Sequence, residues 1–173
     1  LKKEGVDIDA YTLKKYNLAL LPNPPKIRVF NQGDMGELMT DNFTFETTVK
    51  NTFSDGSNAC QFVEVLIQCK DDIIVIPLGA KACTGSMRLY AAGEAVDSKL
   101  ADLSKFGCDL NEWTTLKVLT REKRMTFYIN GVEAYALTFP NARTGIVGVQ
   151  YRFNGVGAVK DAKFSHGDFE VKL

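Results

Sequence analysis

Five side chains in strand-like segments of the sequence have the chemistry to hold a ligand. They are one arginine and four tyrosines: Arg88, Tyr90, Tyr128, Tyr135 and Tyr151. A tyrosine ring offers a flat face for stacking on a sugar ring, and a guanidinium offers a planar set of hydrogen-bond donors. If their strands are neighbours, we expect the five side chains to line one concave sheet. The alternative is that the rings fill the edge of the core, which is ordinary for tyrosines in strands.

No catalytic or metal-binding motif accompanies these residues. The chain has no G-x-S-x-G sequence and no Gly-rich phosphate loop, and its one histidine, His166, lies in a polar turn sequence. The segment SDGSN (54–58) offers oxygen ligands for calcium, but it is equally typical of a plain turn, and no second acidic residue is placed beside it. We therefore predict no catalytic residue, no metal and no cofactor.

The four cysteines do not have the spacing of zinc ligands. Cys60, Cys69, Cys83 and Cys108 each lie within or beside an apolar run. Such positions are common for free buried thiols, which we expect here, with one disulfide as the alternative.

Length and charge exclude several classes of protein. A chain of 173 residues suits one domain with a substantial core. Lys plus Arg and Asp plus Glu are both 21, so the formal net charge is zero. A nucleic-acid partner would normally require a basic excess, so we predict none. No apolar run approaches the roughly 20 residues that span a bilayer, so we predict no membrane insertion of this segment.

Residues 1–25 differ from the remainder of the chain. Asp9 is a candidate helix N-cap, Leu13 and Tyr16 follow at helical spacing, and three prolines end the segment. We interpret 1–25 as a linker or lead-in segment and 26–173 as the folded domain.

From residue 26 onward, short alternating segments separated by turn signals predict an all-β fold. Two of them flank Asn130-Gly131, a strong hairpin signal because both residues of a type I′ turn need positive φ. In that hairpin we expect Phe127 to face Ala134 and Met125 to face Ala136, with Tyr128, Tyr135 and Leu137 on the other face. A single helical turn is expected within 98–106, capped by Ser98. The predicted strands cover 26–30, 43–51, 61–69, 72–78, 85–92, 113–120, 125–129, 132–139, 145–153 and 157–165.

The C-terminal half carries a recognisable pattern. It has a Trp before an L-x-V strand, a strand ending in Y-I-N-G, then G-x-V-G-V and G-x-V-x-D-x-x-F strands. This pattern resembles concanavalin A-like and laminin G-like jelly rolls over about 105–165, and the resemblance extends back to about residue 26. The residues that match it are Trp113, Leu116, Val118, Tyr128, Ile129, Asn130, Gly131, Gly145, Val147, Gly148, Gly157, Val159, Asp161 and Phe164.

The resemblance implies an antiparallel two-sheet β-sandwich. At the position of Trp113 in this pattern we expect a core anchor, with a platform for ligand stacking as the alternative. The resemblance also suggests comparison with the β-glucanases of this fold, in which a strand with the sequence E-x-D-x-x-E presents paired carboxylates. No such strand occurs here: Glu46 and Glu64 are isolated, and Glu94 and Asp97 are three residues apart.

We therefore expect a non-catalytic, extracytoplasmic module, periplasmic or at the cell surface, that belongs to a larger protein. Its ligand is a glycan or a protein partner. Two alternatives stay open from the sequence: a glycoside hydrolase with an atypical site, and a purely structural domain.

Overall fold

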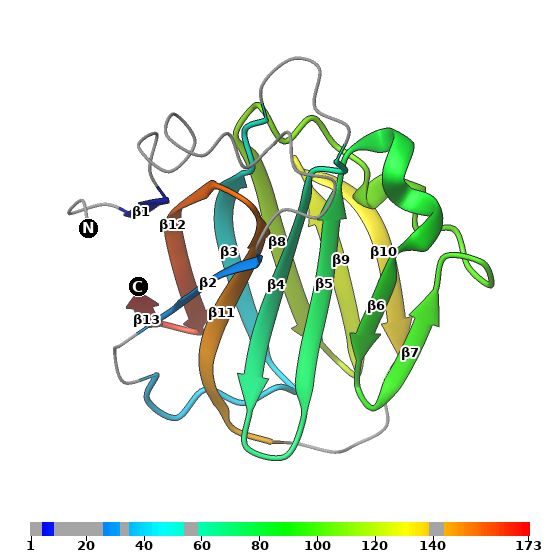
Figure 1. The fold of residues 1–173 in the computed structure, drawn as a ribbon. Coiled ribbons are helices and arrows are strands. Elements are labelled where there is room, and N and C mark those ends of the chain that lie inside the picture. The colour runs from blue at the N-terminus through cyan, green and yellow to red at the C-terminus, as the bar shows by residue number, and fades with distance from the viewer. Residues whose placement is uncertain (1–4, 9–25, 32–34, 54–58, 139–143) are drawn as a thin grey trace.

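Two antiparallel sheets face each other in the computed structural model, which describes residues 5–8, 26–31, 35–53, 59–138 and 144–173 (Figure 1). Sheet A has seven strands, in the order β1 (Gly5–Ile8), β12 (Gly157–His166), β3 (Phe43–Lys50), β8 (Thr114–Arg121), β9 (Arg124–Ile129) and β10 (Val132–Thr138), with β13 (Phe169–Lys172) paired to β12. Sheet B has six strands, in the order β2 (Lys26–Phe30), β11 (Ile146–Asn154), β4 (Phe62–Cys69), β5 (Ile73–Gly79), β6 (Arg88–Ala91) and β7 (Glu94–Asp97). The predicted antiparallel β-sandwich of the jelly-roll type is confirmed.

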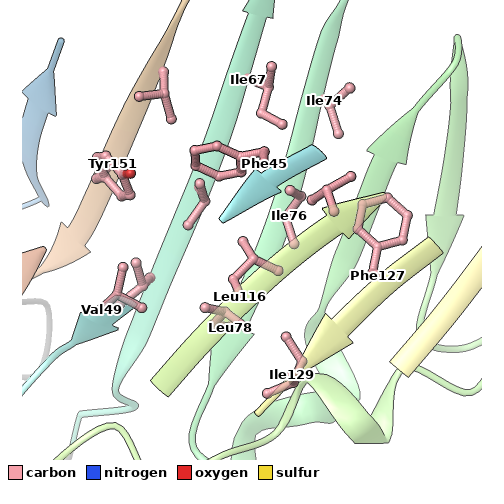
Figure 2. Packing of buried hydrophobic residues seen from close by; sticks show 14 of the residues in the cluster. Phe45, Val49, Ile67, Ile74, Ile76, Leu78, Leu116, Phe127, Ile129 and Tyr151 are labelled. Carbon is pink, nitrogen blue, oxygen red and sulfur yellow. The ribbon is translucent and has the colours of Figure 1, made fainter. Parts of the chain in front are cut away.

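Alternation along the strands builds the core between the two sheets. In β3, Phe43, Phe45, Thr47 and Val49 are buried, and the side chains between them are half-buried. Phe45 packs on Phe164 of β12, with ring centroids 4.4 Å apart. Figure 2 shows apolar side chains from both sheets filling the space between them. Each such burial contributes roughly 1.5–3 kcal/mol against the entropy lost on ordering the chain.

Three short strands fall outside the predicted set: β1, β7 and β13. The turn that joins β6 to β7 is Ala92-Gly93, with φ values of 56° and 77°, and Gly167, with φ 57°, lies between β12 and β13. Alanine rarely adopts positive φ, so the sequence carries only a weak hairpin signal before β7.

The Asn130-Gly131 turn forms as predicted, but the expected faces of its hairpin are wrong beyond Glu133. Asn130 and Gly131 have φ values of 50° and 79°. A register shift between Glu133 and Tyr135 then places Tyr135 opposite Phe127, where Ala134 was expected. An inserted residue of this kind moves every later side chain to the other face of its strand.

The region 98–106 begins with a turn capped by Asp97 rather than by Ser98. The Asp97 carboxylate accepts a hydrogen bond from the Lys99 backbone N–H at 2.9 Å. A 3-10 turn, η3 (Ser104–Phe106), follows. Leu103 is buried, whereas Leu100 is 88% exposed. Among the described residues, no helix is long and apolar enough to cross a membrane.

Part of the N-terminal segment belongs to the sandwich. Gly5–Ile8 pairs with β12 as an edge strand of sheet A. The helix expected from Asp9 falls outside the described residues. The domain boundary after residue 25 stays a prediction.

One disulfide joins Cys60 to Cys83, so the expectation of free thiols is wrong for this pair. Cys60 precedes β4, and Cys83 lies in the 3-10 turn η2 (Lys81–Ser86) that follows β5. Because Phe62 pairs with Gly79 across these antiparallel strands, the two cysteines meet just beyond the end of the ladder. Cys69 and Cys108 are free, as expected.

A fully buried asparagine connects the sheets at one end of the sandwich. Asn51, which follows β3, donates from Nδ2 to the backbone oxygens of Asn154, at 2.8 Å, and of Val156. Its Oδ1 accepts the backbone N–H of Phe62 in sheet B at 2.9 Å. Sequence reasoning missed this residue, because a single Asn after a strand is an ordinary turn signal.

Candidate ligand-binding surface

The five predicted site residues do not share one face. Tyr151 lies on the inner face of β11 and is 3% exposed. Its hydroxyl forms a 2.8 Å hydrogen bond with Thr47 Oγ1 of the opposite sheet. Burial raises the pKa of the Tyr151 hydroxyl, and the bond with Thr47 offsets this only in part. Tyr151 is therefore a core residue that joins the sheets, and the expectation that it lines a ligand surface is wrong.

Tyr135 and Tyr128 also lie apart from Arg88 and Tyr90. The bulge in β10 turns Tyr135 inward, where it packs against the core cluster. Tyr128 faces outward, but from sheet A, where it pairs with Lys117 and Glu133. The prediction that these rings share a surface with Tyr90 is therefore wrong.

Arg88 and Tyr90 do share a face. They lie two residues apart on β6 and project from the outer side of sheet B, because Leu89 between them points into the core. Tyr90 pairs with Val75 of β5 and Ala95 of β7. The Arg88 guanidinium donates from Nη2 to Asp97 Oδ2 at 3.1 Å, and its side chain is 67% exposed.

The carboxylate of Asp97 orients this guanidinium. A hydrogen bond from the Lys99 backbone N–H, followed by the bond from Arg88, holds the pKa of Asp97 below its ordinary value. Asp97 thus stays ionised at neutral pH and fixes one edge of the guanidinium. The Arg88 side chain is otherwise largely exposed to solvent.

The strand register aligns two rows of outward side chains across sheet B, which together we name the sheet B face. Leu66 and Gln150, in the middle of the first row, are 4% and 6% exposed although they point away from the core, whereas Phe30 at its end is 52% exposed. The first row is Phe30, Gln150, Leu66, Val75, Tyr90 and Ala95. The second row is Arg28, Arg152, Glu64, Pro77, Arg88 and Asp97.

The carboxylates of this face are poorly placed for glycoside hydrolysis. Glu64 pairs with Arg152 at 2.5 Å, and both side chains are largely buried. Asp97 lies three strands away from Glu64 in the same row. Three strand spacings amount to about 14 Å, whereas paired glycosidase carboxylates lie about 5–9.5 Å apart. On the described strands of this face, Glu64 and Asp97 are thus too far apart to act as such a pair.

Other chemical groups give no better site in the described part of the chain. Burial raises the pKa of the Cys69 thiol to about 12 and also raises that of Cys108, so both thiols are protonated and weakly nucleophilic at neutral pH. No described group of three or more His, Cys, Asp and Glu side chains is arranged to hold a metal ion. The calcium alternative at SDGSN (54–58) falls on residues outside the described ranges.

Two hollows lie away from Tyr90. One of about 400 Å³ lies at an end of the sandwich between the segment 35–39, Lys70 and the start of β11. A smaller one of about 70 Å³ opens at the sandwich edge between β2 and β12, where Phe30 and Tyr151 contribute to its mostly apolar lining. Both hollows are lined by residues other than Tyr90 and Arg88.

Trp113 is not the expected core anchor. Thr114 points inward at the start of β8, so the residue before it points outward from sheet A. The Trp113 side chain is 38% exposed, and the ammonium groups of Lys50 and Lys160 lie over its ring.

Comparison with solved structures finds similar β-sandwich folds. The chain is similar to carbohydrate-binding module CBM66 from Bacillus subtilis, with 12% identity over 81% of each chain and a TM-score of 0.54. It is also similar to sheep galectin-11 in complex with glycerol, with 12% identity, 84% of this chain and 99% of that chain covered, and a TM-score of 0.51. A third similar structure is a putative glycosyl hydrolase from Parabacteroides distasonis, with 11% identity, 83% and 84% covered, and a TM-score of 0.52.

At 11–12% identity these likenesses show a shared fold and nothing finer. They agree with a jelly-roll β-sandwich, the coarser form of the resemblance seen in the sequence. No protein-family model and no curated protein matches the sequence.

Proposed function

We propose that this chain is a non-catalytic carbohydrate-binding module and that a glycan binds on the sheet B face around Tyr90 and Arg88. The observation that carries the proposal is the outward pair on β6, a half-buried aromatic ring beside a guanidinium held by Asp97. Stacking on the ring and planar hydrogen bonds from the guanidinium are the two contacts that orient a sugar. The fold shared with CBM66 and a galectin supports this class of ligand.

Two further observations support the non-catalytic, extracytoplasmic part of the proposal. The carboxylates of the sheet B face are too far apart for glycosidase chemistry, and Glu64 is engaged by Arg152. The Cys60–Cys83 disulfide suits an oxidising compartment such as the periplasm or the cell surface. As a binding module, the chain would serve as one part of a larger protein.

Binding to a glycan array, followed by titration of the best neutral oligosaccharide, tests the proposal. Tyr90→Ala and Arg88→Gln should each weaken binding about tenfold, which corresponds to roughly 1.4 kcal/mol of lost contact. Tyr128→Ala is the matched control, because Tyr128 is also half-buried and outward-facing but lies on sheet A. We expect its affinity to equal that of the wild type.

Three outcomes would contradict the proposal. The first is that the array shows no bound glycan, which would favour a protein ligand or a purely structural role. The second is that Tyr90→Ala and Tyr128→Ala bind as tightly as each other. The third is release of reducing sugar that disappears in Glu64→Gln, which would favour the hydrolase.

A further inference from the structure

A tryptophan and two lysines form a cluster on the outer face of sheet A, on the opposite side of the sandwich from Tyr90. The ammonium nitrogens of Lys50 and Lys160 lie 4.8 Å and 4.5 Å from the centroid of the Trp113 ring. Cation–π attraction holds each ammonium over the ring at this distance. The indole therefore gathers two positive charges at one place while the residue remains 38% exposed.

The strand register adds two hydroxyl groups beside this cluster. Lys160 of β12 pairs with Thr48 of β3, and Thr48 pairs with Thr115 of β8. The Thr48 and Thr115 hydroxyl oxygens lie 3.5 Å apart at the exposed surface. Lys50 and Trp113 lie two residues further along the same strands, so all five side chains project from one small area of the face.

The charges of this cluster differ from those of the other lysines on the same face. Lys117 and Lys163 both pair with Glu46, at 3.3 Å and 3.0 Å, and Lys172 pairs with Glu170 at 3.3 Å. Neither Lys50 nor Lys160 has a carboxylate within 4.0 Å among the described residues. Their positive charge is therefore available to an external anion.

We infer that Trp113, Lys50, Lys160, Thr48 and Thr115 form a second glycan site, selective for sugars that carry a carboxylate or sulfate group. The two ammonium groups bind the anionic group, the threonine hydroxyls meet the sugar hydroxyls, and the exposed part of the indole contacts the sugar ring. The chain has no net charge, so this selectivity comes from local arrangement rather than from the overall field.

The composition of the face favours an acidic glycan over a nucleic acid. A nucleic acid needs a continuous basic stripe along which successive phosphates lie. Here the Glu46 carboxylate lies between Lys117 and Lys163 on the neighbouring part of sheet A, so the positive charge of the face is interrupted rather than continuous. The cluster instead suits a single anionic sugar unit within an oligosaccharide.

The site contains the only tryptophan of the chain, which gives a direct signal for binding. We would titrate the protein with an oligogalacturonate of defined length, with its methyl-esterified form, with a sulfated dextran oligomer and with single-stranded DNA, following Trp113 emission. We expect the carboxylated or the sulfated oligomer to bind and change the emission, with affinity that falls as salt rises. The methyl-esterified form should bind at least tenfold more weakly than the carboxylated one.

Lys50→Gln/Lys160→Gln should weaken binding of the acidic oligomer about tenfold. The matched control is Lys99→Gln/Lys123→Gln, which removes the same charge from two exposed positions on distant turns and should bind as the wild type does. Trp113→Phe, followed by calorimetry because it lacks the emission signal, should weaken binding as well. Thermal melts of each variant separate loss of binding from loss of folding.

Equal loss of affinity in the two lysine pairs would overturn the inference, because binding would then follow net charge alone. Equal affinity for the methyl-esterified oligomer would also overturn it, and tighter binding of DNA than of either acidic oligomer would assign the cluster to another class of ligand. Loss of neutral-sugar binding in Tyr90→Ala leaves this test unaffected, so the two sites succeed or fail separately.

Discussion

Glu46 on the outer face of sheet A lies between Lys117 and Lys163, whereas Glu64 on the outer face of sheet B pairs with Arg152. The two faces thus differ in how their outward side chains are arranged. The described strands of sheet A carry threonines, lysines and glutamates opposite one another, and Lys50 and Lys160 lie over the ring of Trp113 beside them. Sheet B carries apolar, aromatic and planar polar side chains, with Tyr90 and Arg88 toward one edge.

Alternation along a strand assigns a side chain to a face of the sheet, but it does not determine what that face can bind. Both faces contain a half-buried outward tyrosine, Tyr128 on sheet A and Tyr90 on sheet B. Tyr128 has Lys117 and Glu133 as cross-strand neighbours, and Tyr90 has Val75 and Ala95. Cross-strand neighbours, and hence register, decide which ring has an apolar surround suited to stacking.

The largest effect on stability should come from truncating a buried tyrosine, compared with an outward one. Tyr151→Ala should lower the free energy of unfolding by about 3–5 kcal/mol, because it empties a buried aromatic site and leaves Thr47 without its partner. Tyr90→Ala should cost less than about 1 kcal/mol, because an outward side chain leaves no cavity in the core. Urea unfolding of both variants measures the difference, and similar costs would contradict the assignment of Tyr90 to a surface.

The next effect concerns the disulfide, which ties together one end of sheet B. Cys60→Ala/Cys83→Ala should lower the free energy of unfolding by about 2–4 kcal/mol, as expected for a crosslink that closes a loop of this length. Reductant should destabilise the wild type by a similar amount and leave the double variant unchanged. If reductant affected both proteins equally, the stabilisation would come from something other than the crosslink.

A smaller effect distinguishes two turns, one in each sheet. Asn130 and Ala92 both have positive φ, but only Asn130 also bonds to a neighbouring strand, where its Oδ1 accepts the Thr115 backbone N–H at 2.8 Å. Asn130→Ala should destabilise by about 1–3 kcal/mol, and Ala92→Asn should stabilise by up to about 1 kcal/mol, because Asn tolerates this conformation better than Ala. Thermal melts measure both variants. If Asn130→Ala and Ala92→Asn shifted the melting temperature in the same direction, the two turns would not be equivalent in backbone strain.

The smallest effect should come from the ion pairs on sheet A. Burial opposes ionisation of Glu46, but Lys163 and Lys117 outweigh it and hold the pKa of Glu46 below its ordinary value of 4.5. The stabilisation is therefore present above pH 4.5 and lost as the pH falls through the lowered pKa. Glu46→Gln should cost about 0.5–1 kcal/mol at pH 7.

The difference between wild type and Glu46→Gln should vanish in strongly acidic solution, where the wild-type carboxyl is protonated. Urea unfolding at several pH values measures it. Glu133→Gln is the control, since the Glu133–Arg124 pair is more exposed and should contribute less. A Glu46→Gln effect that stayed constant with pH would mean that the side chain acts by packing rather than by charge.

Most strands could be predicted from the sequence, and the candidate site only in part. The period of two that marks β3 or β8 is a local property, and so is the need for positive φ at Asn130-Gly131. Arg88 and Tyr90 were placed on one face correctly because they are two residues apart on one strand. Whether they bind a ligand stays a prediction. Tyr151 could not be placed, because each strand of a sandwich has two faces and alternation does not say which is inward.

By itself, then, the sequence determined the strand segments, the main hairpin and the all-β class, because these follow from torsion angles and spacing within a few residues. The tertiary structure alone decided what depends on register between distant segments. Thr47 and Tyr151 meet across the core at a separation of 104 residues, and Cys60 finds Cys83 only because β4 and β5 pair. The gathering of Lys50, Trp113 and Lys160 from three strands has the same origin, since a shift of one residue in any of them would turn its side chain to the other face.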